Sequence, residues 1–471
     1  MLNVINGMAR EFEGAMLGDA RRARRLVKIA TDIAQDPSAS LPDAAGSDAA
    51  LEACYRFLNS EAVTAEDILA PHRRCTEARA KDVETLLVVH DTSSIELRGD
   101  DAVEGLGPLR HKNGKRGFFA HVSLAVSLAE HADPLGVVAV STYVRKPHRV
   151  TSRRTKTLDH PENETTRWRS GVDESQAVLA SARPIHVMDR EADVYELLHH
   201  FIKRGQRFVV RSQDDRATIE PIAGTRRHVR ISSMLAPQVS IAARTITLSR
   251  RREPELPVAR RMHPGRGERE ARVSIRATNV EILRSTSLPT SLPPSLRIGV
   301  VEVVELDPPP GAEPVHWRLL TSEAISTAEH VERVVDMYRA RWRIEELFKA
   351  LKTGCAFERR GFRSYAAFRR ALAVFLPVAW RMLRLRALSR SLEERPATDV
   401  LSPTQLAVLR ATSRRVPLSA TPSAKDVLLA VAGLGGHLKR NGAPGWQTLG
   451  RGLDKLLFFE LGWQAAMEAK L

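Results

Sequence analysis

The sequence predicts an α/β protein with a mixed-sheet core and an inserted β domain, flanked by helical regions toward both ends of the chain. Three observations predict this class. Apolar residues recur at helical spacing over residues 1–80, strand-like runs begin at Thr85, and helical spacing returns from about residue 364. Because 471 residues exceed the usual size of one compact domain, two or three domains are expected.

The N-terminal region, residues 1–80, is expected to contain three helices. Asp19 precedes a segment over 20–35 with apolar residues at helical spacing and could cap it, and two further helices are expected over 47–58 and 64–79. A charged helix face is usually only solvated, but so many arginines in one turn of a basic chain favour contact with phosphates. The arginines of this first helix that we expect at such a phosphate-contacting surface are Arg21, Arg22 and Arg25.

The central region is expected to follow the order strand, strand, strand, helix, strand, helix, strand. Short apolar or β-branched runs predict the strands, of which the second and third form a hairpin. The expected strands are 86–90, 118–128, 135–145, 184–189 and 207–211, and the expected helices are 172–182 and 191–203. The polar and basic residues 146–170 predict a loop.

Residues 214–300 interrupt this order with short β-like runs separated by Arg-rich and Pro-rich turns, a pattern typical of an inserted β domain. This region includes an exposed basic loop at 250–270. Strand character returns at 315–322, and a long helix is expected at about 327–353. We therefore expect a helical domain at 1–80, a core at 81–369 with its β insertion at about 214–315, and a helical domain at 370–471.

The composition narrows the class of partner. Lys and Arg outnumber Asp and Glu by 72 to 56, giving a net charge of +16, which suits nucleic acid first and an anionic membrane surface second. Three scattered cysteines are too few for a disulfide framework or a zinc knuckle. No segment approaches the roughly 20 apolar residues that span a bilayer, and no secretory signal is evident. A cytoplasmic protein without a membrane partner, in a bacterium one at the nucleoid, is expected.

Two aspartates follow apolar runs that predict buried strands. Asp91 ends TLLVVHD and Asp189 ends PIHVMD. Open α/β sheets present ligand-binding groups at the carboxyl ends of strands, and carboxylate oxygens are the ligands that Mg²⁺ prefers. A lone strand-end Asp is more often a turn-former or a helix cap. Two of them in this strand order favour a metal site.

The segment YRARWRIEELFKALK, residues 338–352, carries a third acid. At roughly 100° per residue, one face of a helix collects one carboxylate, two cations and a phenol within an arc of roughly 60°. These residues are Tyr338, Arg341, Glu345 and Lys352, with Lys349 beside them. A solvent-exposed ion pair of Glu345 with Lys349 would not require Tyr338 and Arg341 on the same face. Phosphoryl transfer would use the whole set, with the carboxylate as a metal ligand and the other side chains holding phosphates. Glu346 is the rival third acid, but it is turned roughly 100° away from this face.

At these residues the chain resembles the DDE transposases of the insertion-sequence-four family. That family has the signature Tyr, two residues, Arg, three residues, Glu, six residues, Lys, and the 338–352 segment meets it at every position. HDTSS, with Asp91, and MDREAD, with Asp189, resemble the family's first and second acid motifs. The resemblance extends to LGDARRARRLV near the N-terminus and GLGGHLKRNGAPGW near the C-terminus. Phe348, where a family member has His, and the 250–270 loop depart from it.

The resemblance implies a ribonuclease-H-like core between an N-terminal DNA-binding region and a C-terminal dimerisation region. It implies a cut-and-paste transposase in which Asp91, Asp189 and Glu345 hold two Mg²⁺ ions per site, with Mn²⁺ as a substitute. The implied partners are the terminal inverted repeats of a transposon, target DNA and a second copy of the chain. Cleavage would pass through a DNA hairpin, and strand transfer would follow.

The resemblance also assigns residues to DNA. Trp317 would stack on a base flipped out near the transposon end, because an indole can replace the lost base stacking. Arg190 and Arg211 are expected phosphate contacts in the same cleft. Two alternatives keep the same residues: a nuclease or integrase with this core that does not transpose, and a non-catalytic DNA-binding regulator. A glycosidase fits poorly, since only 5% of the residues are aromatic.

Overall fold

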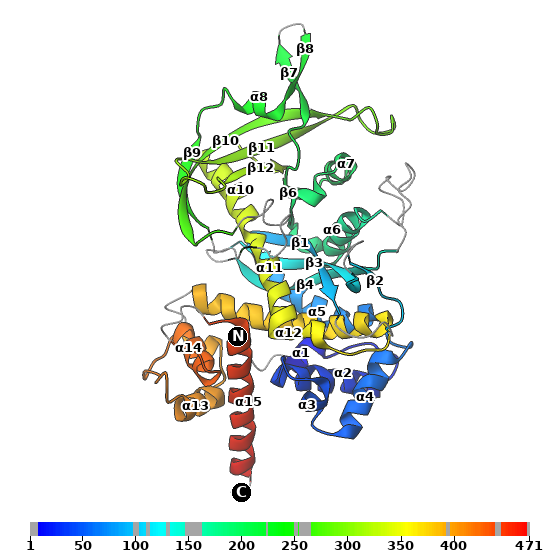
Figure 1. Ribbon diagram of the computed structural model, residues 1–471, viewed down its shortest axis with the longest axis vertical. Helices are drawn as coiled ribbons and strands as arrows, with labels where there is room; N and C mark the ends of the chain where they lie inside the picture. The colour runs from blue at the N-terminus through cyan, green and yellow to red at the C-terminus, as the bar shows by residue number, and fades with distance from the viewer. Residues whose placement is uncertain are drawn as a thin grey trace. The chain divides into compact units, whose positions relative to one another are not determined.

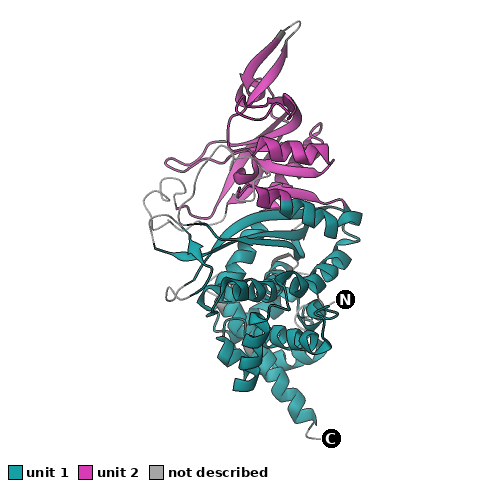
Figure 2. Cartoon of the chain, turned by 90° about the vertical axis from the view of Figure 1, so that its right-hand side faces the viewer, with its two compact units in different colours: residues 1–152, 170–182, 342–471 teal, residues 153–169, 183–341 magenta. Residues whose placement is uncertain are grey.

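The computed structural model describes residues 8–97, 103–109, 114–128, 132–146, 163–222, 225–248, 253, 265–391, 396–438 and 444–468. Two compact units divide the chain (Figure 2). Unit 1 comprises residues 1–152, 170–182 and 342–471, and unit 2 comprises residues 153–169 and 183–341. Both units combine β-strands with helices, so the predicted mixed α/β class is confirmed.

Five helices begin unit 1 (Figure 1). They are α1 (Met8–Phe12), α2 (Ala20–Gln35), α3 (Leu41–Ala45), α4 (Asp48–Asn59) and α5 (Ala65–Ala80). The side chains of Asp19, Ser47 and Thr64 accept backbone N–H groups at the starts of α2, α4 and α5. The three predicted helices are therefore confirmed to within one residue. The two others have only five residues each, too short for a periodic signal.

The sheet of unit 1 is antiparallel. It consists of β1 (Leu86–Glu96), β2 (Gly107–Pro108), β3 (Arg116–Ser127) and β4 (Asp133–Tyr143), and β3 pairs with each of the others. The predicted hairpin of the second and third long strands is thus confirmed. Nearly every residue of β3 is buried, as expected for a central strand covered on both faces.

The position of Asp91 corrects one premise of the sequence argument. The first strand does not end at residue 90 but continues to Glu96, and Asp91 lies in its middle, opposite Val122 of β3. Residues 86–90 are buried, whereas the following four are half-buried and polar. The polar half is not recognisable as a strand from the sequence, because it is fixed by its pairing with β3 and not by an apolar pattern of its own.

The rest of unit 1 is helical. It includes α11 (Trp342–Lys349), the π-helix η4 (Ala350–Gly354), the 3₁₀ turns η5 (Phe357–Arg359) and η6 (Ala397–Asp399), α12 (Tyr365–Ser391), α13 (Pro403–Thr412), α14 (Ala424–Leu434) and α15 (Trp446–Glu468). Helix α12 packs against β4, α5 and α2, and α11 packs against β1 and β3. Helices α13, α14 and α15 share an apolar cluster that includes Leu409, Val431 and Leu453.

The predicted long helix at 327–353 is interrupted. Helix α10 (Ala328–Ala340) ends before Arg341, α11 follows, and residues 350–354 adopt π-helical hydrogen bonding. A π-helix has wider turns than an α-helix, so the angular spacing assumed for Lys352 does not hold past Lys349. The break after α10 is also the boundary between the two units.

Unit 2 contains a sheet with the strand order β5-β6-β12-β11-β10-β7-β8, and β9 also pairs with β10. The strands are β5 (Ile185–Met188), β6 (Arg207–Arg211), β7 (Ala217–Ile222), β8 (Thr225–Arg230), β9 (Ala242–Leu248), β10 (Arg269–Leu283), β11 (Ser295–Glu305) and β12 (His316–Thr321). Strands β5 and β6 are parallel. Strand β6 pairs with β12, with Arg211 opposite Leu319, although the strands β7 to β11 of the same sheet lie between these two in the sequence.

The helices of unit 2 differ slightly from the prediction. The helix expected at 191–203 is a 3₁₀ turn, η3 (Arg190–Ala192), followed by α7 (Tyr195–Lys203), and α8 (Ile231–Leu235) lies among the β7–β10 strands. Helix α6 (Thr166–Val178) starts before residue 172, and its residues from 170 on belong to unit 1, as does the following η2 (Ala180–Ala182). Most of the 146–170 and 250–270 loops lies outside the described residues. Among the helices that the structure describes, none has the length and apolar character to cross a membrane.

Candidate active site

Asp91 occupies a half-buried position on β1 in unit 1. Its Oδ1 accepts the backbone N–H of Thr92 at 2.8 Å. Side chains alternate along a strand, so the neighbouring His90 faces the other side of the sheet, where it is buried and hydrogen-bonded to Ser123 at 2.8 Å. The carboxylate of Asp91 is therefore partly open to solvent, whereas the neighbouring His90 is enclosed in the core.

Glu345 and its neighbour Glu346 lie on α11, which packs on the strand that carries Asp91. Glu346 is buried, forms an ion pair with Arg343 at 2.6 Å, and lies 3.9 Å from Arg386 of α12. Arg343 also donates to the carbonyl of Ala132 at 3.0 Å. Glu346 thus joins α11 to α12 through Arg386, whereas Glu345 is half-buried on another face of α11. The geometry favours Glu345 over Glu346 as the reactive acid.

Asp189 directly follows β5 in unit 2, at the carboxyl end of that strand as predicted. Its Oδ1 accepts the backbone N–H of Glu191 at 2.9 Å and caps η3. Asp193, the other aspartate of MDREAD, is buried and fully engaged: it accepts Ser212 Oγ at 3.0 Å and Arg216 Nε at 2.8 Å. Asp193 therefore fixes the turn, while Asp189 is half-buried at its start.

Tyr338, Arg341 and Trp317 belong to unit 2. Tyr338 is buried at the end of α10 and meets the half-buried Trp317 of β12 edge-to-face, with ring centroids 5.4 Å apart. Arg341 follows α10 in helical conformation. Arg211 donates to the carbonyl of His316 at 3.3 Å, next to Trp317 in the chain. Tyr338 thus acts as a support for the indole, so its phenol is less accessible than the sequence suggests.

Two lysines of the same signature segment lie in unit 1. Lys349 is exposed, with its Nζ 4.9 Å from the ring centroid of Trp342. Lys352 lies on η4, where its Nζ donates to the carbonyl of Ser94 on β1 and forms an ion pair with Glu358 at 3.3 Å. Lys352 therefore joins the π-helix to the strand that contains Asp91.

The other predicted DNA contacts are surface arginines. Arg21 is exposed on α2, while Arg22 and Arg25 are half-buried, and Arg22 donates to the carbonyl of Leu17 at 3.1 Å. In unit 2, Arg190 is exposed beside Asp189.

The two units each carry part of the predicted acid set. Asp91 and Glu345 lie on contacting elements of unit 1, and Asp189 lies in unit 2. Among the residues that the structure describes, no group of three or more His, Cys, Asp or Glu is close enough to hold a metal ion. The donors themselves suit a hard divalent cation, because all three are carboxylates and each is half-buried.

The chain is thus a basic α/β protein with one candidate acid on a strand, one directly after a strand and one on a helix packed against a sheet. Comparison with known families identifies the class of protein. Residues 7–63 match the family described as transposase DNA-binding, and residues 84–376, more than half of the chain, match the transposase DDE domain. The chain belongs to the DDE transposases. Transposase function and a DNA partner are thereby confirmed, and enzymes of this family generally use divalent metal ions.

Proposed function

We propose that this DDE transposase is a cut-and-paste enzyme of the insertion-sequence-four family, most similar to the transposon-five transposase. The observation that carries the proposal is the complete spacing of Tyr338, Arg341, Glu345 and Lys352. The packing of α11 on β1 supports it, because it brings the element with Glu345 against the strand with Asp91.

In this proposal Asp91, Asp189 and Glu345 together hold two Mg²⁺ ions, for which Mn²⁺ can substitute. The ions would supply activation of the attacking hydroxyl and stabilisation of the leaving oxygen. The burial of Glu346 and Asp193 supports the choice of their neighbours Glu345 and Asp189, which are half-buried and thus more open to a ligand. The hydrogen bond from Lys352 to the carbonyl of Ser94 positions η4 beside β1.

The remaining residues would hold and shape the DNA. In the first step water nicks the transposon end. The freed 3′-hydroxyl then attacks the opposite strand and forms a hairpin. Water opens the hairpin, and the released 3′-hydroxyl finally attacks target DNA and is joined to it. Cationic side chains bind the flanking phosphates throughout, and Tyr338 supports this surface. These cations are Arg341, Lys349, Lys352, Arg190 and Arg211, together with Arg21, Arg22 and Arg25 on α2.

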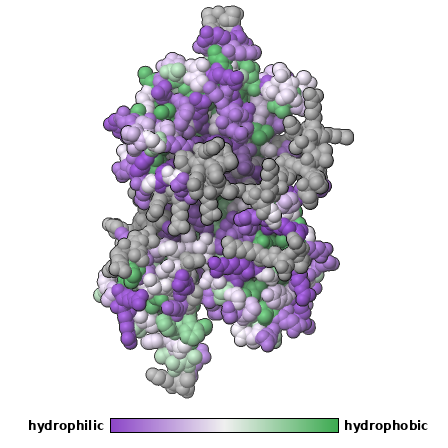
Figure 3. Space-filling view, viewed as in Figure 1, coloured by the Kyte–Doolittle hydropathy of each residue, from purple (hydrophilic) through white to green (hydrophobic). Residues whose placement is uncertain are grey.

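We further propose the domain limits 1–80 for DNA binding, 81–369 for the core with its insertion at about 214–315, and 370–471 for dimerisation on paired DNA ends at the nucleoid. The exposed apolar side chains of α15 support the last of these. They are Phe458, Phe459, Leu461, Trp463 and Met467. Figure 3 shows green surface toward the lower end of the view, where Figure 1 draws this helix.

The direct test begins by sequencing the DNA that flanks the reading frame and then uses a fragment that carries the short inverted repeats expected there. With Mg²⁺ or Mn²⁺, the full-length protein is expected to release the fragment through hairpin ends and to insert pre-cut ends into a plasmid. A chelator is expected to abolish both reactions. Cleavage without strand transfer would indicate a nuclease, and binding without cleavage under any divalent ion would indicate a regulator.

Substitution of Trp317 tests the proposed base stacking. Trp317→Ala is expected to slow hairpin formation by about 10- to 100-fold, since stacking on an aromatic side chain contributes roughly 1–3 kcal/mol per base. Trp317→Phe is expected to recover most of the rate. The first nick, measured on the same gels, serves as the internal control. Equal slowing of the nick and the hairpin step would contradict a stacking role and point to lost support of Tyr338.

A further inference from the structure

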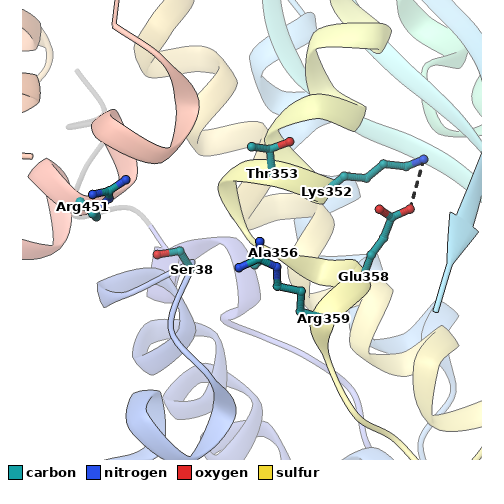
Figure 4. A pocket seen from close by; sticks show the side chains of 7 residues that line it. All are labelled: Ser38, Lys352, Thr353, Ala356, Glu358, Arg359 and Arg451. Carbon is teal, nitrogen blue, oxygen red and sulfur yellow. Dashed lines mark ion pairs between the residues drawn. The ribbon is translucent and has the colours of Figure 1, made fainter. Parts of the chain in front are cut away.

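A pocket of about 390 Å³ lies within unit 1, next to the π-helix η4 (Figure 4). It is lined by residues from four segments: Ser38 after α2, Lys352 and Thr353 on η4, Glu358 and Arg359 on η5, and Arg451 on α15. A second pocket, of about 300 Å³, shares Ser38 and Arg359 with the first, so the two are neighbours. The C-terminal helix therefore contributes to a hollow beside the signature segment.

The charge of this pocket is unbalanced. Its one carboxylate, Glu358, is engaged by Lys352 and also accepts the backbone N–H of Glu96 at 3.0 Å. Arg359 and Arg451 are both exposed, and neither forms an ion pair with any residue in the described ranges of the chain. Figure 4 shows Arg451 on one side of the pocket and Arg359 on the other, and both line it. Because Lys352 engages the one carboxylate among the lining residues, a bound anion would balance the charge of the two guanidinium groups.

The wall that carries Arg359 is held rigidly. The adjacent Arg360 is buried and donates to the backbone carbonyls of Pro37, Ala39 and Cys355, which joins the segment after α2 to η5. Ala356 has a φ of 47°, a left-handed conformation that costs a non-glycine residue free energy. A backbone fixed in this way holds the Cα of Arg359 at a defined place in the pocket wall, which favours a pre-organised site.

We propose that this pocket binds a phosphate of the DNA backbone, with Arg359 and Arg451 as its ligands. The proposal rests on the proposed function for its substrate, and it adds a DNA contact made by α15, the helix otherwise assigned to dimerisation. A guanidinium group matches the geometry of a phosphate, and two of them on opposite sides can bind separate oxygens. Such a contact holds the DNA regardless of its sequence.

The test measures binding of the full-length protein to a labelled duplex of random sequence at a series of NaCl concentrations. Arg359→Ala and Arg451→Ala are each expected to weaken binding roughly 5- to 10-fold at low salt. The slope of log K against log salt is expected to fall by about 0.9 for each phosphate that the variant no longer neutralises. Arg451→Lys is expected to restore the slope. Arg415→Ala, which removes an exposed arginine outside the pocket, is the matched control and should leave the slope unchanged.

The outcomes separate this proposal from the proposed function. If the wild-type protein binds and cleaves DNA but both pocket variants keep its affinity and salt slope, the phosphate site is wrong and the transposase proposal stands. If Arg415→Ala weakens binding as much as the pocket variants do, the effect is one of overall charge and the site is again wrong. A wild-type protein that binds no DNA contradicts both. Melting temperatures equal to that of the wild type exclude loss of folding as the cause.

Discussion

Glu345→Gln is expected to lower DNA end cleavage by about 10³-fold, which corresponds to roughly 4 kcal/mol of transition-state stabilisation. Glutamine keeps the size of the side chain but removes the charge that a divalent ion requires. Because Glu345 is half-buried and α11 is seated by other residues, the melting temperature and the affinity for DNA ends should remain those of the wild type. Single-turnover cleavage and thermal unfolding measure the two properties separately. The same loss of cleavage is expected for Asp91→Asn.

Glu346→Gln is the matched control, because it makes the same chemical change one residue away. Its expected effect is the reverse: the buried ion pair with Arg343 is broken, which costs roughly 3 kcal/mol of folding free energy. The melting temperature should fall, while cleavage per folded molecule stays within a few-fold of the wild type. A Glu345→Gln protein that cleaves normally, together with a Glu346→Gln protein that is stable and inactive, would transfer the catalytic role to Glu346.

Much of the fold could be predicted because its signals are local. Asp19, Ser47 and Thr64 lie at the predicted starts of α2, α4 and α5, where their side chains cap the helices. The apolar runs of β3, β4 and β6 likewise mark buried strands. Periodicity and capping residues report on the neighbouring few turns of chain, and these elements depend on little else.

The differences from the prediction lie where distant pairing decides the structure. The polar half of β1 is a strand because β3 lies beside it, and this places Asp91 in mid-strand instead of at an end. The change from α-helix to π-helix after Lys349 has no periodic signature in the sequence. Arg359 and Arg451 do not stand out in the sequence, because only the folded chain brings η5 and α15 to one pocket.

A buried polar network joins the N-terminal helices to the sheet of unit 1. The carboxylate of Glu11 on α1 accepts from Arg79 at 2.6 Å and lies 2.5 Å from Nδ1 of His72, both on α5. Nε2 of His72 accepts the backbone N–H of Val137 on β4 at 2.9 Å. An amide N–H can only donate, so Nε2 carries no proton and His72 is the neutral tautomer with its proton on Nδ1. This proton is donated to Glu11.

Folding lowers the pKa of both His72 and Glu11. Burial lowers the pKa of His72 below its ordinary 6.5. Burial alone would raise the pKa of Glu11, but the hydrogen bonds from His72 and Arg79 outweigh it and lower the pKa to about 2. Both groups bind protons more readily in the unfolded chain, so acid favours unfolding. The contribution of His72 declines as the pH falls below 6.5, and that of Glu11 declines between 4.5 and about 2.

Glu11→Gln is therefore expected to lower the free energy of unfolding by roughly 3–5 kcal/mol at neutral pH, because it leaves the charge of Arg79 buried without its partner. Glu13→Gln, which changes an exposed acid two residues away, should have almost no effect. The difference between wild type and Glu11→Gln should shrink as the pH falls from 4.5 toward 2, since protonation makes the wild-type carboxyl neutral as well. Denaturant titrations across this range measure it.

A difference that stays constant with pH would mean that Glu11 acts by packing and not by charge. The distinction matters for DNA binding, because Glu11 lies within the segment that matches the transposase DNA-binding family, while His72 lies beyond it and is bonded to the sheet. If the charge of Glu11 holds α1 on α5 and the sheet, Glu11→Gln should also weaken DNA binding at a temperature where the sheet remains folded. The anchoring of α1 on α5 and β4 would then be what fixes the DNA-binding helices of unit 1 against the sheet that contains Asp91.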